Sequence, residues 1–562
     1  MHKRFLQHEL EQWKQSPFRK PLVLQGARQV GKTTLVNDFG KRYSQYLYLN
    51  LEKDVHRKYF QKLDNVEELV QRIFFDHKLK WSKVNQTLLF IDEIQEYPAA
   101  VNFLRYFFED LPQLHVIAAG SMLEALLGKN VSFPVGRVEF MVLRPFSFQE
   151  FLLAIGEEEA IEQLKIVPMN KFATSRLLRL FHTYAFLGGM PEVIKKYAQH
   201  RDITNLFTVY QSLINSYFMD AEKYAESQNS LELLRLIIQK VMVEAGSRVT
   251  NKTFGSQDYK QKDIDATLRA IQKTHLIQLV YPTVNAVQPA MPDFKKSPRL
   301  QLLDTGILNF ASAAHNEILG VEDLNQVFKG RIIEHLVGQE LMSTISYPLG
   351  SLHFWVRDKT GSSAELDFLL PYQGKLIPVE VKSGPTGKLK SLLVFLDQSP
   401  LNFGIRLYYG ELSVDKIKTP AGKPIYLFNF PYFLASQLEN YLPWILKQVE
   451  HNKEDVFLFE EASPSYGLRV DTKVKKSEKE KVLTLENLKP KHFLVLKSLV
   501  EKPLSGKVIL ETVLGITDQS MTRNMYIKSL MDLGLIEWTE PENPISKTQA
   551  YRLTQKGKRF MV

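Results

Sequence analysis

The sequence contains no cysteine among its 562 residues. This absence excludes disulfide bonds, thiolate catalysis, and zinc or iron–sulfur sites that depend on cysteine ligands. The chain also lacks any apolar run approaching about 20 residues, the length that a membrane-spanning helix needs. We therefore expect no membrane partner.

Residues 1–10 are charged and lack the apolar core of a secretory signal peptide. Together with the missing cysteine, this favours a cytoplasmic protein in a reducing compartment. Lysine and arginine number 72 against 62 acidic residues, which gives a net charge of +10. The excess is a mild indication of a polyanionic partner such as nucleic acid.

A glycine-bracketed loop follows the apolar segment 22–25 and opens a predicted helix. In such a loop the backbone amides surround phosphate groups, the lysine binds the β- and γ-phosphates, and the next hydroxyl binds Mg²⁺. The pattern predicts an ATP site with a magnesium ion. Its residues are Gly26, Ala27, Arg28, Gln29, Val30, Gly31, Lys32, Thr33 and Thr34.

The segment 87–94 is an apolar strand that ends in Asp92 and Glu93. An unbroken apolar strand is typical of a buried parallel sheet, whose carboxyl edge carries the functional side chains. We expect Asp92 to hold the magnesium ion together with Thr33. Glu93 is the candidate base that orients and deprotonates the attacking water, so the chain is predicted to hydrolyse ATP.

Two further residues are candidates for catalysis. Ser121 follows the predicted strand 114–120 and is expected to contact the γ-phosphate, to cap the next helix, or both. Arg137 precedes the strand 138–143 and is a candidate to neutralise charge on the transferred phosphoryl group, in its own subunit or in a neighbour. An ordinary surface arginine paired with an acid is the alternative.

Several motifs together resemble those of prokaryotic AAA-type ATPases that carry a C-terminal restriction-endonuclease-like domain of unknown function. The resemblance covers about residues 1–430 and implies a P-loop ATPase core. The motifs are the loop 26–34 and the segments 87–94, 119–121, 136–137, 145–151, 188–192 and 303–306.

We predict an α/β multidomain protein, because buried strands alternate with helical patterns over about residues 15–150. The predicted parts are a P-loop AAA-type ATPase core at 1–150, a helical lid at 151–228, an internal winged-helix-like domain at 229–310, a PD-(D/E)xK nuclease-like α/β domain at 311–450, a charged linker at 451–488 and a C-terminal winged helix-turn-helix at 489–562.

A second set of polar residues lies on a predicted hairpin that turns at 373–374. Alternation along the second strand places Glu380 and Lys382 on one face, and the hairpin brings Asp367 beside them. This order resembles the PD-(D/E)xK nucleases, which implies a magnesium site that Glu334 assists. The alternative is an inactive nuclease fold kept for nucleic-acid binding or assembly.

The C-terminal region predicts three helices followed by two short strands, the order of a winged helix that binds DNA or another protein. Its third helix and wing offer candidate DNA contacts. The candidates are Ser520, Thr522, Arg523, Asn524, Lys528, Lys547 and Arg552.

The leading hypothesis is an ATP-hydrolysing, DNA-binding AAA-type motor that forms a homo-oligomer, such as a ring, and remodels DNA, branched DNA included. One alternative is an ATP-regulated, metal-dependent DNA endonuclease. The other is a nucleotide-switched regulator or scaffold.

Overall fold

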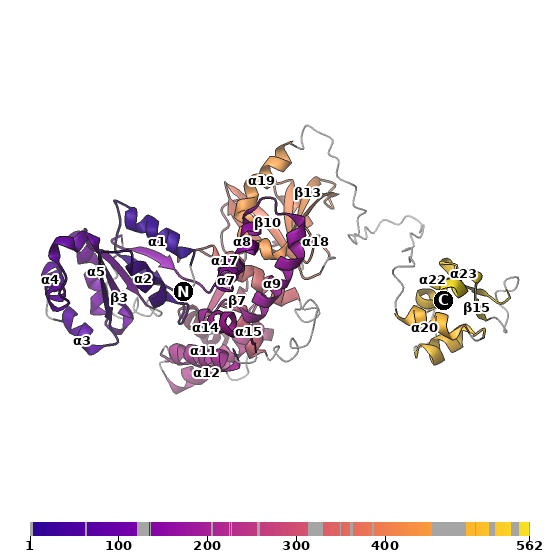
Figure 1. Cartoon of the computed structure of the whole chain (residues 1–562), viewed down its shortest axis with the longest axis horizontal. Coiled ribbons are helices and arrows are strands. Elements are labelled where there is room, and N and C mark those ends of the chain that lie inside the picture. The colour runs from indigo at the N-terminus through magenta and orange to yellow at the C-terminus, as the bar shows by residue number, and fades with distance from the viewer. Residues whose placement is uncertain are drawn as a thin grey trace. The chain divides into compact units, whose positions relative to one another are not determined.

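The computed structural model describes residues 4–61, 65–120, 134, 136–203, 206–223, 225, 227–255, 259–312, 330–348, 350–359, 364–384, 387–451, 490–500, 502–515, 523–540 and 550–560. It contains two compact units, residues 1–468 and 469–562, which are described separately (Figure 1). Within these residues, no helix combines the length and apolarity that a membrane span requires.

A parallel sheet forms the N-terminal part of the first unit. Its strands lie in the order β2, β3, β4, β1, β5, and each neighbouring pair is parallel, which confirms the predicted parallel sheet. Strands β1, β3 and β4 are buried along their whole length, as their apolar sequences predict. The strands are β1 (Leu22–Gln25), β2 (Gln45–Asn50), β3 (Thr87–Asp92), β4 (His115–Ala119) and β5 (Glu139–Val142).

Helices cover both faces of this sheet. Alternate strand residues such as Leu24 and Phe90 share one core with α1 and α2, whereas Val23 and Ile91 share another with α4 and α5. Figure 1 shows β3 between α2 and α5. The helices are α1 (Leu6–Gln15), α2 (Lys32–Gly40), α3 (Asp54–Arg57), α4 (Val66–Asp76) and α5 (Ala99–Glu109).

A helical region follows the sheet, and three further helices then lead into an antiparallel strand pair, β6 and β7. The helical region comprises α7 (Phe148–Ala154), α8 (Glu158–Lys165), α9 (Thr174–Leu187), α10 (Pro191–His200) and α11 (Phe207–Glu222). The next elements are α12 (Gln228–Glu244), α13 (Asn251–Phe254), α14 (Gln261–Gln272), β6 (Ile277–Val280), β7 (Arg299–Leu302) and α15 (Thr305–Ala311).

A second, mixed sheet completes the first unit. Its order is β12, β13, β11, β10, β9, β8, and the central strands β10, β11 and β13 are parallel. The hairpin predicted at 373–374 is present between β9 and β10. The elements are α17 (Gly330–Ser343), β8 (His353–Val356), β9 (Glu365–Tyr372), β10 (Lys375–Lys382), α18 (Lys390–Gln398), β11 (Phe403–Tyr408), β12 (Ser413–Lys418), β13 (Pro424–Pro431) and α19 (Leu438–His451).

Two buried carboxylates join these parts of the first unit. Asp304 accepts hydrogen bonds from the backbone N–H groups of Gly189 and Ile307, and the amide of Gln339 lies 3.4 Å from its Oδ2. Both Asp304 and its neighbour in this network, Glu340, are fully buried. Asp304 therefore ties the turn before α10 to the start of α15 and to α17.

Glu340 of α17 connects three further segments. Its Oε1 accepts from the backbone N–H of Phe148 at 2.9 Å and from the Tyr184 hydroxyl at 2.8 Å. Its Oε2 accepts from Ser436 at 2.8 Å. Burial raises the pKa of this carboxyl from 4.5 to about 7, although these hydrogen bonds act in the opposite direction.

The second unit has a small core of its own, to which Val495, Leu510, Leu530 and Leu553 contribute. Two short strands pair in antiparallel fashion, and Leu504 forms an additional bridge to Tyr551. The elements are α20 (Pro490–Ser498), π-helical segments at Val508–Val513 and Asn524–Lys528, α22 (Ser529–Asp532), β14 (Ile536–Trp538), β15 (Tyr551–Leu553) and α23 (Gln555–Phe560).

We expect Glu340→Gln to remove a pH dependence from the stability of the first unit. Because the folded-state pKa is raised to about 7, Glu340 stabilises the fold fully below pH 4.5 and loses this contribution as the pH rises to 7. The free energy of unfolding of the variant, relative to that of wild type, should rise by on the order of 2–3 kcal/mol between pH 5 and pH 8. Urea unfolding at both pH values measures this, with the exposed Glu439→Gln as control. If the difference in unfolding free energy between variant and wild type did not change with pH, the raised pKa of Glu340 would be contradicted.

Candidate nucleotide-binding site

The phosphate loop lies at the carboxyl edge of the first sheet, between β1 and α2. Gly26 and Gly31 adopt φ values of +144° and +96°, which side chains rarely permit. At Gly26 a Cβ would also lie 2.3 Å from the carbonyl oxygen of Leu143, just after β5. Glycine is therefore required at this position for two independent reasons.

Lys32 is the first residue of α2, and its side chain is buried inside the loop. Its Nζ donates to the carbonyl oxygens of Gly26 at 2.8 Å and Ala27 at 2.9 Å. Burial lowers the pKa of Lys32 to about 8, and the charges of Glu93 and Asp92 oppose this shift. The start of α2 adds its N-terminal amides to the cationic site, which therefore suits a phosphate anion.

Thr33 and Asp92 meet at the predicted magnesium site. The Thr33 hydroxyl donates to Oδ2 of Asp92 at 2.7 Å, and the Tyr48 hydroxyl donates to the same oxygen at 3.1 Å. Asp92 is only 2% exposed, and burial raises the pKa of its carboxyl. A hydroxyl and a carboxylate in contact beside the loop are oxygen ligands of the kind that Mg²⁺ takes, so these residues fit that ion.

Glu93 follows β3 in a left-handed conformation, with φ of 52°. This backbone shape is uncommon for a residue with a side chain, and such residues cluster at functional sites. The Glu93 N–H donates to Oδ1 of Asp92 at 3.1 Å, and the Gln95 amide donates to the Glu93 carboxylate at 2.5 Å. The base predicted from the sequence is thus held beside the predicted magnesium ligand.

Residues far away in the sequence also hold the loop, and no local pattern predicts them. Arg28 forms a 2.7 Å ion pair with the buried Asp220 of α11, and the Tyr217 hydroxyl donates to the Arg28 carbonyl at 2.8 Å. From the N-terminus, Arg4 donates to the Val30 carbonyl at 3.0 Å. The loop is therefore braced by α11 and by the segment before α1.

The two further catalytic candidates have different outcomes. Ser121 lies outside the described residues. Arg137 lies two residues before β5, and β5 runs parallel to β1 with Glu139 opposite Leu22. Arg137 is therefore at the amino edge of the sheet, opposite the phosphate loop, and its Nε pairs with Glu109 at 3.1 Å. A role for it at the site of its own chain is wrong for this reason.

The acidic hairpin brings together the residues that resemble a nuclease site. Lys382 Nζ lies 2.6 Å from Oε1 of Glu380, and Oδ2 of Asp367 accepts from the backbone N–H of Val381 at 2.7 Å. Burial raises the pKa of Glu380 to about 8, with the charge of Asp367 acting in the same direction. Burial likewise raises the pKa of Glu334 to about 7.

Arg299 of β7 enters this cluster, which sequence reasoning did not anticipate. Its guanidinium pairs with Glu365, lies 3.9 Å from Oδ1 of Asp367, and donates to the Asp367 carbonyl at 3.0 Å. Among the described residues no group of three histidine, cysteine or acidic side chains could hold a metal ion. Arg299 lies beside Asp367 and Lys382 pairs with Glu380, so cations already engage two carboxylates of the predicted set, and a metal ion held by Asp367, Glu380 and Glu334 stays a prediction.

The predicted DNA contacts lie partly outside the described residues, namely Ser520, Thr522 and Lys547. Arg523, Lys528 and Arg552 are exposed on the second unit. Arg552 lies on β15 and pairs with Glu537 of β14 at 2.8 Å.

Comparison with protein families assigns models to four parts of the chain. Residues 18–152 match a model described as an AAA domain. This match supports an AAA-type ATPase core. Residues 178–318 and 329–425 match two domains of unknown function, DUF8612 and DUF4143. Residues 494–554 match the C-terminal domain of proteins described as filamentation induced by cAMP protein Fic-like.

No curated protein matches the chain. Among solved structures, a Walker-type ATPase of Pyrococcus abyssi matches with 14% sequence identity and a TM-score of 0.36. The match covers 55% of this chain and 96% of that one. With the AAA domain matched at the phosphate loop and the acidic strand, ATP binding is the activity that the comparisons support.

We expect Glu93→Gln to bind ATP but to hydrolyse it at least about 100-fold more slowly, because an amide cannot accept the proton of the attacking water. Steady-state phosphate release and ATP binding, both measured on the full chain, test this. Glu96→Gln changes an exposed acid three residues away and should hydrolyse normally. Normal turnover by Glu93→Gln would refute the assignment.

We expect Lys32→Ala to weaken ATP binding by about tenfold or more, because the phosphates lose their buried cation. Equilibrium binding of a fluorescent ATP analogue measures the loss. Lys41→Ala, at the exposed end of the same helix, is the matched control. Equal affinities of Lys32→Ala and wild type would show that the phosphates bind elsewhere.

Proposed function

We propose that this protein is a magnesium-dependent ATPase that binds DNA and remodels it as an oligomeric AAA-type motor. The observation that carries the ATPase part is the 2.7 Å contact between Thr33 and Asp92, beside the buried Lys32 and next to Glu93. It brings together a cation that binds the phosphates, two oxygen ligands for Mg²⁺ and a base, which are the parts that phosphoryl transfer requires.

Each residue has a distinct task in this reaction. Lys32 and the loop amides bind and orient the β- and γ-phosphates. Thr33 and Asp92 would hold Mg²⁺, which neutralises charge on the phosphates when bound. Glu93 accepts the proton of the attacking water; its backbone N–H bonds Asp92, and the Gln95 amide holds its carboxylate.

The nucleotide site contacts the helical region in a way that suits a motor. A Cβ added at Gly31 would lie 3.8 Å from Pro191, the first residue of α10. On the other side, Asp220 of α11 pairs with Arg28 of the loop. A change in the loop on hydrolysis therefore acts directly on both helices.

A groove beside β6 and β7 supports the proposal that the partner is nucleic acid. It encloses about 710 Å³ and is lined by Arg269, Lys295, Lys296, Tyr281 and Phe294, among others. Phe294 is 74% exposed and packs edge-on against Tyr281 at 4.9 Å. Lysines beside an exposed aromatic ring suit a nucleic-acid strand, because its phosphates pair with cations and its bases stack on aromatic rings.

The second unit supports the same proposal. Helical segments precede its strand pair, and Arg523, Lys528 and Arg552 are exposed. In a winged helix-turn-helix, the third helix enters a DNA groove while the wing contacts phosphates. We assign these residues to DNA binding in that manner.

The oligomer is proposed from the position of Arg137. Its side chain is 45% exposed at the amino edge of the sheet, away from its own phosphate loop. An arginine at this place can stabilise phosphoryl transfer only in a neighbouring copy. We do not propose nuclease activity, because Arg299 and Lys382 already pair with acids of the hairpin.

The first experiment is steady-state ATP hydrolysis by the full chain with no DNA and with single-stranded, duplex and four-way-junction DNA, at low and moderate salt. Strong stimulation by one form supports the motor and names its substrate. Hydrolysis unaffected by every form would instead favour a nucleotide-switched regulator or scaffold.

We expect Lys295→Gln/Lys296→Gln to weaken DNA binding and to reduce the slope of log affinity against log salt by about 1 to 2, because each lysine releases a counterion at the phosphates. Fluorescence anisotropy across a salt series measures this. The exposed pair Lys165→Gln/Lys171→Gln removes the same charge elsewhere and should leave the slope unchanged. Equal slopes for the two double variants would show that the groove does not bind the DNA phosphates.

A further inference from the structure

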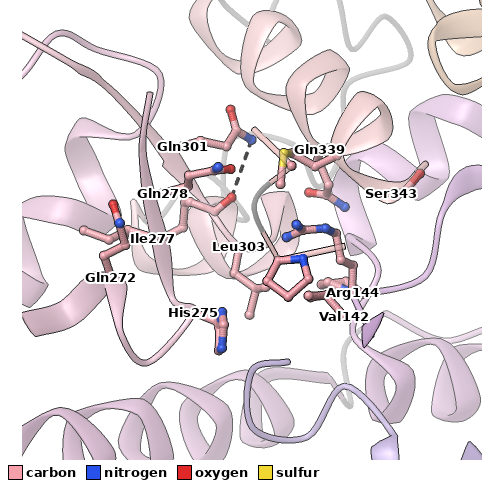
Figure 2. A pocket seen from close by; sticks show the side chains of 15 residues that line it. Val142, Arg144, Gln272, His275, Ile277, Gln278, Gln301, Leu303, Gln339 and Ser343 are labelled. Carbon is pink, nitrogen blue, oxygen red and sulfur yellow. Dashed lines mark hydrogen bonds between the residues drawn. The ribbon is translucent and has the colours of Figure 1, made fainter. Parts of the chain in front are cut away.

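A cavity of about 120 Å³ lies in the first unit, where the end of β5 meets β6, β7 and α17. Figure 2 shows its lining, with Arg144 and Gln339 on the right of the view and Gln272 and His275 on the left. No residue of the phosphate loop lines it. The cavity is therefore separate from the nucleotide site.

Arg144 provides the only charge fixed at every physiological pH in this lining. Its Nε donates to the carbonyl of Ile345 at 3.1 Å, and among the described residues no other group bonds its guanidinium. Burial alone lowers the pKa of Arg144, to about 10, so no described acid compensates its charge. Arg144 is partly buried, and a cation withdrawn from water without a counterion is costly, so proteins normally pair it.

The remaining polar groups of the lining are uncharged. Burial lowers the pKa of His275 to about 4, aided by the charges of Lys32 and Arg144, so its ring is neutral near pH 7. Gln272, Gln339 and Ser343 already form hydrogen bonds within the protein, whereas Oε1 of Gln278 is buried without a partner. The cavity thus combines one unpaired cation with neutral hydrogen-bonding groups.

We propose that this cavity binds the phosphoryl group of a small ligand, with Arg144 as its counterion. A guanidinium with free N–H groups matches a tetrahedral oxyanion, which it bonds in bidentate fashion. A single water needs only about 10–15 Å³ of such space. The cavity, at about 120 Å³, therefore has room for a phosphate ion.

The ligand would be coupled to the nucleotide site, because two chains of contacts join them. Leu143, which precedes Arg144, packs on Gly26, and Arg4 donates to the carbonyls of both Arg144 and Val30. On the other side, Gln339 bonds Asp304, which holds the turn before α10. Such coupling is reciprocal, so ATP would change the affinity for the anion by the same factor.

The test is calorimetric titration of the full chain with inorganic phosphate and with pyrophosphate, in the Lys32→Ala background that disables the nucleotide site. We expect one equivalent to bind, and Arg144→Gln to weaken this binding at least tenfold. Arg179→Gln, an exposed arginine on α9, should leave it unchanged. This test does not depend on the proposed ATPase, since hydrolysis plays no part in it.

Two outcomes would overturn the proposal. One is the absence of anion binding in Lys32→Ala when wild type binds, which would assign the anion to the nucleotide site. The other is that the Lys32→Ala protein binds the anion with the same affinity whether or not it also carries Arg144→Gln. If Arg144→Gln fails to fold, His275→Asn, which tolerates the φ of 61° at this position, should still weaken binding several-fold.

Discussion

The first unit depends on two carboxylates that have no contact with water. Asp304 and Glu340 accept hydrogen bonds from segments that are far apart in the sequence, before α10, at α7, in α9 and after β13. A buried acceptor left without its donors is expensive, so these segments hold one another in place. The helical region, α15, α17 and the segment after β13 are therefore packed around a shared polar core.

The chemistry of the nucleotide site was predictable because its main parts are local in sequence. The loop 26–34 and the strand ending at Asp92 and Glu93 each carry their own signal, and parallel strands bring them to one edge. The supporting residues were not predictable. Arg4 and Asp220 reach the loop through tertiary packing, which no pattern of neighbouring residues reports.

The same distinction applies to the rest of the fold. The turn at Gln373 and Gly374 follows from short-range turn chemistry, and the hairpin formed as predicted. Arg299 was not predicted at the acidic hairpin, because no pattern within either segment indicates an ion pair between β7 and β9. Arg137 was misplaced for a simpler reason: a residue that precedes a parallel strand must lie at the amino edge.

Gly26 has a mechanical consequence for the loop. A side chain at Gly26 would clash with the Leu143 carbonyl, so the first end of the loop packs directly against the backbone that follows β5. Around Gly31, by contrast, the neighbouring atoms of Pro191 and Arg4 are at ordinary van der Waals distance. The loop is therefore packed most tightly where it leaves the sheet and less tightly where it meets α10, although Arg4 bonds the Val30 carbonyl at that end too.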